Sequence, residues 1–251
     1  MYDLKGRVAV VTGGASGIGA AISRTMAEAG AFVVVVDINR ETAEAEVATL
    51  KEAGYGADAV IINLADEVSV VAGCQEIVEK HGAPWALVNN AGLQDRQLLL
   101  EGTVEEWDRM NAVNARGPFL MIRELGRDMV EKGEGGRIVN VASLSLRGQI
   151  VKGLACYVGS KGALAALTQA SALELVEHGI TVNTVLPGGV MTPGSLQAKG
   201  PAPEGPACRA TPLGLCEGED IASAVLYFSL PAARRVTNQT LAVDAGFSIA
   251  Y

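Results

Sequence analysis

The chain has 251 residues, of which 49% are hydrophobic and 19% charged, a composition that excludes a disordered protein and can fill a large core. Its formal net charge of -8 argues against a nucleic-acid or anionic-membrane surface, because both depend on clustered positive charge. Its four cysteines are widely spaced and none forms a C-x-x-C pair, so neither a disulfide framework nor a metal site is expected.

Short apolar runs rich in β-branched residues alternate with segments of helical spacing. Strands are predicted at 7–12, 31–37, 57–63, 85–90, 137–142, 181–186 and 240–244. Segments with helical spacing include 20–29, 41–53, 155–176 and 220–229. Several strands are almost continuously apolar, such as F-V-V-V-V, which is typical of parallel strands covered on both faces. The alternation predicts the α/β class, with a doubly wound, mostly parallel sheet of seven strands in a single domain spanning residues 1–251.

The first predicted strand runs into a glycine-rich turn, T-G-G-A-S-G-I-G at 12–19, and a helical segment follows. Glycines in such a turn let the backbone approach a pyrophosphate, and the start of the helix attracts its negative charge. The order strand, turn, helix favours a dinucleotide site over a purely structural turn. The cofactor contacts expected in this turn are Gly13, Ser16, Gly17, Ile18 and Gly19.

Asp37 closes the second predicted strand, 18 residues after Gly19. A carboxylate at this position can bind both ribose hydroxyls of an adenosine. It would also repel the 2′-phosphate of NADP, and the glycine turn contains no Lys or Arg to offset that repulsion. Arg40 is close in sequence, but we expect it to face solvent at the start of the next helix. The sequence therefore predicts NAD as the cofactor.

The spacing of the turn, G-x-x-x-G-x-G, resembles that of the short-chain dehydrogenase/reductase family, and later motifs agree in order. These motifs are N-N-A-G at 89–92, Asn114, the set Ser143, Tyr157 and Lys161, and Pro187-Gly188. The resemblance extends from Gly6 to Gly246. It implies a Rossmann fold and hydride transfer between a nicotinamide dinucleotide and a secondary alcohol or ketone.

Tyr157 and Lys161 are four residues apart in a segment of helical spacing, so they share one helix face, one turn apart. Hydride removal from an alcohol carbon requires that the hydroxyl proton leave as well. A lysine charge at roughly 4 Å would lower the pKa of the phenol by up to about three units, less the cost of desolvation. We therefore expect Tyr157 to be the general acid/base and Lys161 its electrostatic partner.

The resemblance implies further roles. Lys161 would also hold the nicotinamide ribose, Ser143 would orient the substrate oxygen, and Asn114 would hold a water that relays protons toward Lys161. The simpler alternatives are an anchored tyrosine, a lysine that reaches solvent and a turn-forming serine. The other cofactor contacts expected are Ile38, Asn63, Leu64, Asn90, Ala91, Gly92, Pro187, Gly188, Val190 and Thr192, besides Tyr157 and Lys161.

The stretch 191–215 is rich in Pro and Gly, which cannot sustain a long helix, and is predicted to be a substrate lid. The substrate contacts expected are Gln94, Ser145, Gln149 and Met191. Apolar residues dominate the predicted walls and favour a mostly apolar secondary alcohol or ketone, of a cyclic or aromatic type. The lid ends in P-L-G-L-C-E-G-E-D, without the Arg and Pro that relatives carry there. A 3-oxoacyl-thioester reductase remains an alternative.

Two other classes share parts of this pattern. A methyltransferase can have the sheet, the glycine turn and the acidic residue, but it does not need a Tyr-x-x-x-Lys pair. A dinucleotide-binding regulator without turnover would keep the glycine turn and Asp37 but need not keep the catalytic set. A Ser-His-Asp hydrolase is disfavoured, because the only histidines, His81 and His178, lie near predicted helix ends followed by Gly.

The predicted setting of the protein is the cytoplasm. No basic-then-apolar leader opens the chain, and no apolar run reaches about 18 residues, so we expect a soluble protein. The resemblance also implies a homotetramer, in which the apolar helix at 155–176 and the ending at 246–251 would lie near subunit interfaces. Its partner would be a small-molecule alcohol or ketone.

Overall fold

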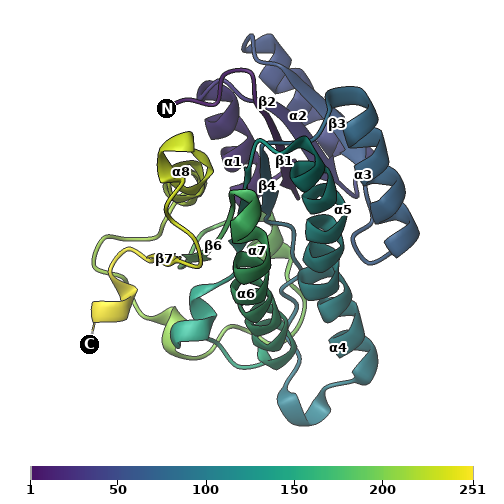
Figure 1. Cartoon of the computed structure of the whole chain (residues 1–251). Coiled ribbons are helices and arrows are strands. Elements are labelled where there is room, and N and C mark those ends of the chain that lie inside the picture. Colours follow the sequence, from purple (N-terminus) through teal and green to yellow (C-terminus); the bar gives the residue numbers. More distant parts are fainter. Residues whose placement is uncertain (1, 251) are drawn as a thin grey trace.

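The computed structural model describes residues 2–250 (Figure 1), so the first and last residues of the predicted domain lie outside it. One parallel sheet of seven strands has the order β3-β2-β1-β4-β5-β6-β7. The strands are β1 (Val8–Thr12), β2 (Phe32–Asp37), β3 (Ala57–Ile61), β4 (Ala86–Asn89), β5 (Gly136–Val141), β6 (Ile180–Pro187) and β7 (Thr240–Val243). The predicted doubly wound α/β fold is confirmed, and each strand ends within about two residues of its predicted limits.

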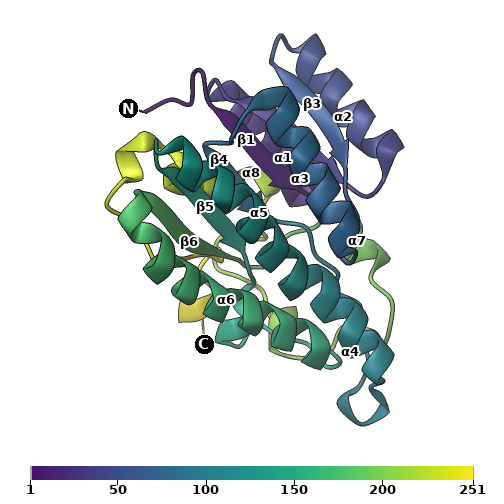
Figure 2. The ribbon, with the colours of Figure 1, turned by 45° about the vertical axis from the view of Figure 1, so that its right-hand side comes forward.

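Helices cover both faces of the sheet. The helices are α1 (Gly17–Glu28), α2 (Arg40–Glu52), α3 (Glu67–His81), α4 (Val104–Asn111), α5 (Gly117–Lys132), α6 (Ala155–Leu175), α7 (Pro193–Gln197) and α8 (Gly218–Ser229). One core cluster joins the sheet to α1, α2 and α8, and a second joins its other face to α3, α5 and α6. Figure 2 shows α3, α5 and α6 side by side on that second face.

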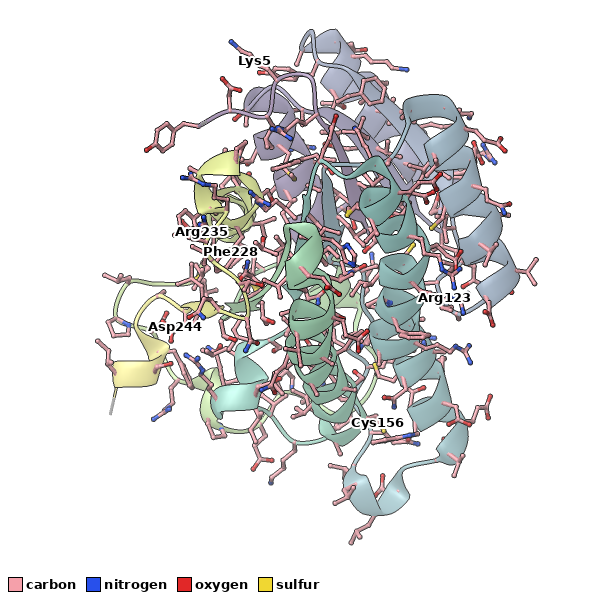
Figure 3. All side chains as sticks on the ribbon, viewed as in Figure 1. Lys5, Arg123, Cys156, Phe228, Arg235 and Asp244 are labelled. Carbon is pink, nitrogen blue, oxygen red and sulfur yellow. The ribbon has the colours of Figure 1, made fainter. Side chains whose placement is uncertain are left out.

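The fully apolar strands explain why a layer of helices can cover each face of the sheet. In β2, Val33 and Val35 belong to the first cluster, and Val34 and Val36 belong to the second. Because successive side chains point to opposite faces, a strand covered on both faces must be apolar at every position. In the first layer Phe228 of α8 is 2% exposed, whereas Arg123 on the outside of α5 pairs with Glu67 of α3 (Figure 3).

The longer helices α3, α4 and α5 do not fall within any of the four segments for which helical spacing was named above. Two have start signals in the sequence, since the Asp66 side chain accepts a hydrogen bond from Val68 N and Thr103 accepts one from Glu106 N. Their charged faces lie opposite an apolar stripe, so the amphipathic pattern was also a signal that could have identified them. Within residues 2–250 no helix is both long and apolar enough to cross a membrane.

The strand order places the site. β1 lies between β2 and β4 in the sheet. The chain adds β2 and β3 on one side of β1, and then adds β4 to β7 on the other side. In sheets of this kind the ligand crevice lies at that switch, beyond the carboxyl ends of the strands. Thr12, Asp37 and Asn89 are the last residues of β1, β2 and β4. The motifs that follow them in the sequence therefore meet at one edge of the sheet.

Candidate active site

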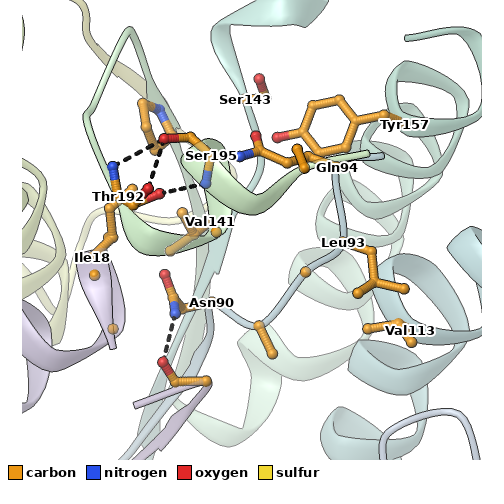
Figure 4. Close-up of a pocket in the computed structure, with 18 of the residues that line it drawn as sticks. Ile18, Asn90, Leu93, Gln94, Val113, Val141, Ser143, Tyr157, Thr192 and Ser195 are labelled. Carbon is orange, nitrogen blue, oxygen red and sulfur yellow. Dashed lines mark hydrogen bonds between the residues drawn. The ribbon is translucent and has the colours of Figure 1, made fainter. Parts of the chain in front are cut away.

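A cleft of about 670 Å³ opens at the carboxyl ends of the strands. Every residue predicted to contact the cofactor lines it, from Gly13 in the first turn to Thr192 in the lid. Its walls also include Ser143 and three of the predicted substrate contacts: Gln94, Ser145 and Gln149. The glycine turn, the Tyr-Lys pair and the predicted substrate end thus share one cavity. Figure 4 shows Ile18, Ser143 and Tyr157 among the residues that line it.

Two predicted site residues do not line the cleft. Met191 is 62% exposed, because the extended chain there turns alternate residues inward and the neighbours Val190 and Thr192 face the cavity instead. Its side chain therefore lies outside the cleft in this conformation, and its substrate contact stays a prediction. Asn114 is fully buried behind Gly92. A Cβ at Gly92 would lie 3.2 Å from Lys161 Nζ and 3.3 Å from Asn114 Oδ1.

The glycine turn is folded closely on itself. A Cβ at Gly19 would lie 1.8 Å from the carbonyl oxygen of Gly13, and a Cβ at Gly13 would lie 2.9 Å from Ala91 Cα. Gly13 and Gly17 also have positive φ angles of 60° and 51°. Ser16 precedes α1 without a side-chain cap, and the first turn of α1 contains no acidic residue. The turn therefore fits a pyrophosphate, since its amides and the positive end of the helix dipole remain available.

Thr12 and Asn90 hold the turn against β4. The Thr12 hydroxyl accepts hydrogen bonds from the backbone N–H groups of Asn90 and Ala91, at 3.0 and 3.2 Å. The Asn90 amide donates to the carbonyls of Thr12 and Gly13, at 3.1 and 3.3 Å (Figure 4). Thr12 was not among the predicted site residues, although its place at the end of the first strand is a signal that could have identified it.

At the opposite end of the cleft, Asp37 accepts a hydrogen bond from Asn39 N at 3.1 Å. Ile38 beside it is 65% exposed, and Asn63 is exposed as well. Arg40 does not neutralise this carboxylate, because its guanidinium pairs with Glu44 at 3.2 Å on the outside of α2. The predicted orientation of Arg40 toward solvent is confirmed, and Asp37 remains the nearest charge to the adenosine end.

Tyr157 and Lys161 lie on the first turns of α6. The Lys161 ammonium is 6.0 Å from the centroid of the Tyr157 ring and donates a hydrogen bond to Val141 O at 2.8 Å. Ser143 follows β5, and its Oγ accepts a hydrogen bond from Ser145 N at 3.1 Å. Figure 4 shows the hydroxyl end of Tyr157 directed toward Ser143. A carbonyl or carbinol oxygen placed between these two hydroxyls would contact both.

Burial dominates the acid–base properties of this pair. It raises the pKa of Tyr157, and the hydrogen bond with Ser143 only partly opposes that change. It lowers the pKa of Lys161 to about 8. The expected lowering of the pKa of Tyr157 by Lys161 is therefore wrong for the protein alone, because burial of the phenol dominates and the ammonium donates to Val141 O. At neutral pH the site holds a protonated phenol and a charged lysine.

Asn114 lies within a π-helical turn, Ala112–Arg116, which interrupts the long helical segment. Its side chain accepts a hydrogen bond from Leu93 N at 2.8 Å and donates to Leu93 O and to Ser160 Oγ, at 2.9 and 3.0 Å. Ser160 in turn donates to the carbonyl of Tyr157 at 2.7 Å. Asn114 thus connects the loop after Gly92 to the backbone of the candidate acid/base.

The lowered pKa of Lys161 leads to a prediction about stability. It corresponds to a cost of about 3 kcal/mol for burying the charge, and loss of the hydrogen bond to Val141 O would cost about 1 kcal/mol. We therefore expect Lys161→Met to raise the free energy of unfolding of the dinucleotide-free protein by about 2 kcal/mol at pH 7. Urea titration measures this change.

The pH dependence has a definite sign. Between pH 8 and 10.5 the unfolded chain binds the Lys161 proton more tightly than the folded chain, so wild-type stability rises with pH in that range. The advantage of Lys161→Met should thus be complete below pH 8 and disappear towards pH 10.5. Lys51→Met, on the exposed end of α2, is the control and should show no such trend. An equal advantage at both ends of the range would contradict the assigned burial cost.

The lid, 191–215, contains only the short α7 and a single 3-10 turn, Pro206–Cys208, in agreement with its predicted lack of a long helix. Thr192 caps α7 through reciprocal hydrogen bonds with Ser195 (Figure 4). A Cβ at Gly17 would lie 3.1 Å from Thr192 Cβ, so the start of the lid packs on the glycine turn.

Two anchors fix the middle of the lid. At the first, Asp95 accepts a hydrogen bond from Lys199 N, and the Arg96 backbone and guanidinium donate to Lys199 O and Pro201 O, each at 2.8 Å. Gly200 is required there, because a Cβ would lie 1.9 Å from Arg96 O. The second anchor joins 150–152 to 204–207 through Lys152 N to Glu204 O and Ala207 N to Ile150 O.

The cleft is also lined by residues that were not predicted as site residues. These are Leu93, Asp95, Val113, Leu154, Gly194, Ser195, Gln197, Ala198 and Ala207, with the strand-end residues Val36, Ile62, Val141, Ala142 and Gly189. The two histidines lie elsewhere, since His81 ends α3 beside Asp58 at 3.0 Å and His178 ends a 3-10 turn after α6. Neither lines the cleft, which removes the basis for a hydrolase.

Comparison with known proteins agrees with this geometry. A family model described as short chain dehydrogenase matches residues 7–200. Sorbitol dehydrogenase of Cereibacter sphaeroides is 35% identical, covering 97% of this chain and 98% of its own. The 2,5-dichloro-2,5-cyclohexadiene-1,4-diol dehydrogenase of Sphingobium indicum is 36% identical, covering 98% of each chain.

The chain is also similar to solved structures of dehydrogenases and reductases. A gluconate 5-dehydrogenase from Burkholderia cenocepacia J2315, in complex with NADP and tartrate, has a TM-score of 0.90 and 30% identity, covering 100% of this chain and 98% of its own. A 3-ketoacyl-(acyl-carrier-protein) reductase from Brucella melitensis, complexed with NADH, has a TM-score of 0.89 and 33% identity, covering 98% of this chain and 100% of its own.

Proposed function

The chain belongs to the short-chain dehydrogenase/reductase family, and we propose that it transfers a hydride between NAD(H) and a secondary alcohol or ketone. Family membership makes it an oxidoreductase and removes the methyltransferase alternative. One observation carries the finer proposal: Ser143, Tyr157 and Lys161 line the same cleft as the glycine turn and Asp37. A cytoplasmic homotetramer is the assembly we propose by analogy with the family.

The proposed chemistry divides between the cofactor and the chain. When bound, the nicotinamide accepts a hydride from the carbinol carbon in oxidation, or supplies one to the carbonyl carbon in reduction. Tyr157 Oη takes the carbinol proton in oxidation and donates it to the carbonyl oxygen in reduction, so that the charges balance. Ser143 hydrogen-bonds the reacting oxygen and fixes its position. Lys161 stabilises the phenolate and would bind the nicotinamide ribose, with Asn114 holding a water that leads toward it.

The acid–base properties of the site suggest the easier direction at neutral pH. Because burial raises the pKa of Tyr157, the phenol is protonated and ready to donate to a carbonyl oxygen. Oxidation of an alcohol needs the phenolate, whose fraction increases with pH. We therefore propose that the enzyme reduces ketones near neutral pH and that its oxidation rate rises toward alkaline pH.

NAD is the proposed cofactor because Asp37 is the charge nearest the adenosine end and Arg40 is engaged with Glu44. A carboxylate at this point attracts ribose hydroxyls and repels a 2′-phosphate. The solved relatives include both cofactors, NADH in one and NADP in another. The preference must therefore come from this chain's own residues at the end of β2.

Asp37→Asn is expected to reverse much of this preference. The amide keeps an oxygen that can accept from Asn39 N, but it removes the charge that repels the phosphate. We expect the ratio of kcat/KM for NADP to that for NAD to rise at least about tenfold, since a like-charge contact costs several kcal/mol. Steady-state kinetics with both cofactors measure the ratio. Glu41→Gln, which removes a nearby exposed charge outside the cleft, should leave it unchanged.

The substrate proposed from the walls of the cleft is a largely apolar ketone or secondary alcohol, cyclic or aromatic. Leu154, Val190 and Ala207 supply apolar surface in the walls of the cleft. The test is a panel of secondary alcohols and ketones, with absorbance of the reduced nicotinamide as the readout and both cofactors run in parallel. Failure of every compound to react, with NAD bound, would favour the non-catalytic regulator instead.

A further inference from the structure

We propose that the cleft contains a neutral polar subsite beside the reacting oxygen, and that this subsite binds a second hydroxyl on the neighbouring carbon of the substrate. The subsite consists of Gln94, Ser145 and Gln149. The preferred substrate is then a neutral vicinal diol or polyol, or the matching hydroxyketone. This inference rests on the proposed function. It narrows the proposed substrate from a largely apolar secondary alcohol or ketone to one that also carries a second hydroxyl group.

Gln149 carries the first part of the argument. It is 9% exposed and lines the cleft, and its side-chain amide forms no hydrogen bond with any of residues 2–250. Its backbone is held, since Gln149 N donates to Leu144 O at 3.4 Å. A Cβ at Gly188 would lie 3.3 Å from Gln149 Oε1, and a Cβ at Gly189 would lie 3.8 Å from Nε2. Room is thus kept for a buried amide whose donors and acceptor are free for a ligand.

Ser145 carries the second part. It is 6% exposed, and its Oγ is a buried oxygen with no hydrogen-bond partner among the described residues. An unpaired buried hydroxyl is costly, so one that lines a cleft favours a ligand able to pair with it after a rotation about χ1. Ser145 N donates to Ser143 Oγ at 3.1 Å, and only Cα and Cβ separate that nitrogen from the Ser145 hydroxyl. The two serine hydroxyls are therefore on neighbouring parts of the same turn, and in the proposed complex they would serve adjacent substrate carbons.

Gln94 closes the subsite from the opposite wall. In Figure 4 its amide extends toward the hydroxyl end of Tyr157, below Ser143. It also forms no side-chain hydrogen bond with any of the residues described. Two neutral amides and a neutral hydroxyl thus line the same cleft as Tyr157 and Ser143, which would hold the reacting oxygen.

The charged residues of the cleft favour a neutral hydroxyl over an anionic group as the ligand of the subsite. The charged residues in its walls are Asp37, Asp95 and Lys161. Asp95 is paired with Arg109 and Lys199 N, and Lys161 donates to Val141 O. Arg96 nearby is occupied by lid carbonyls. Lys161, the cation in the described walls, has the proposed role of binding the nicotinamide ribose, so no further cation there would receive a carboxylate or phosphate beside Ser145, whereas amides can both donate to and accept from a hydroxyl.

The experiment compares cyclohexanol with cis- and trans-cyclohexane-1,2-diol, using the full-length protein and NAD. We expect kcat/KM for the better diol to exceed that for cyclohexanol at least about tenfold, the discrimination typical of buried polar groups that need a partner. Gln149→Met keeps the side-chain length but removes the amide, and should reduce the diol-to-cyclohexanol ratio to about one. Gln75→Met, exposed on α3, is the matched control and should keep the wild-type ratio.

A binding measurement removes the dependence on turnover. In Tyr157→Phe loaded with NAD, calorimetry should give a Kd for the diol at least about tenfold below that for cyclohexanol, and Gln149→Met in the same background should abolish the difference. Equal efficiency and equal binding of diol and cyclohexanol would overturn the subsite while the proposed function stands. Preference for 2-hydroxycyclohexanecarboxylate would overturn its neutral character. Absence of both turnover and binding would overturn the proposed function together with the subsite.

Discussion

Tyr157→Phe is expected to lower kcat by about a thousandfold while the dissociation constant for NADH changes less than about threefold. The loss follows from the removal of the proposed proton donor and acceptor, since general acid–base catalysis contributes about 10² to 10⁴ in rate. The binding should persist because the glycine turn, Asp37 and the Asn90 contacts do not involve the phenol. Steady-state kinetics and fluorescence titration with NADH measure the two quantities.

The control for this variant is Tyr227→Phe. Tyr227 is 48% exposed on α8, where its ring contacts Phe228 at a centroid distance of 5.3 Å. Removal of its hydroxyl should leave both kcat and NADH binding at wild-type values. If Tyr157→Phe instead retained more than about 3% of wild-type activity, Tyr157 could not be the acid/base.

Gly19→Ala is expected to weaken NADH binding at least about a hundredfold. The added Cβ would lie 1.8 Å from Gly13 O and 2.6 Å from the Asn90 amide, so the turn must open. Backbone cannot yield as a flexible side chain does, and the amides that would receive the pyrophosphate then lose their common orientation. Calorimetric titration with NADH measures the loss, and circular dichroism checks that the fold persists.

Gly126→Ala is the matched control, because nothing lies within 4 Å of a Cβ at that position in α5. It should bind NADH as the wild type does and gain about 0.5–1 kcal/mol in stability from its higher helix propensity. Wild-type affinity in a folded Gly19→Ala protein would show that the dinucleotide phosphates bind elsewhere.

The strands, and with them the place of the cleft, could be predicted from sequence because each has a strong local signal. F-V-V-V-V in β2 is apolar at every position, which only a strand covered on both faces requires. Asp37 and the glycine turn each follow such a run, so their meeting at one edge of the sheet follows from parallel strand order. Prediction succeeded where a short run of residues determines the structure.

The features that could not be predicted depend on distant parts of the chain. Asp95 and Lys199 are 104 residues apart, and no local pattern indicates that they pair. The pKa of Tyr157 depends on how much protein surrounds the phenol and where the Lys161 ammonium turns, neither of which helical spacing reveals. Met191 was placed in the cleft because the lid was predicted as a segment, without the alternation that turns Val190 and Thr192 inward.

The two anchors of the lid determine how ligands can pass. Within the described residues, 191–197 hydrogen-bond only with one another, whereas 199–201 and 204–207 are fixed to the wall. Entry of ligands into the cavity and their exit should therefore depend on movement of α7, between the fixed points at Val190 and Ala198. The oxidised cofactor and the product would both leave when α7 moves. The slower of these two release steps would then limit the rate of turnover.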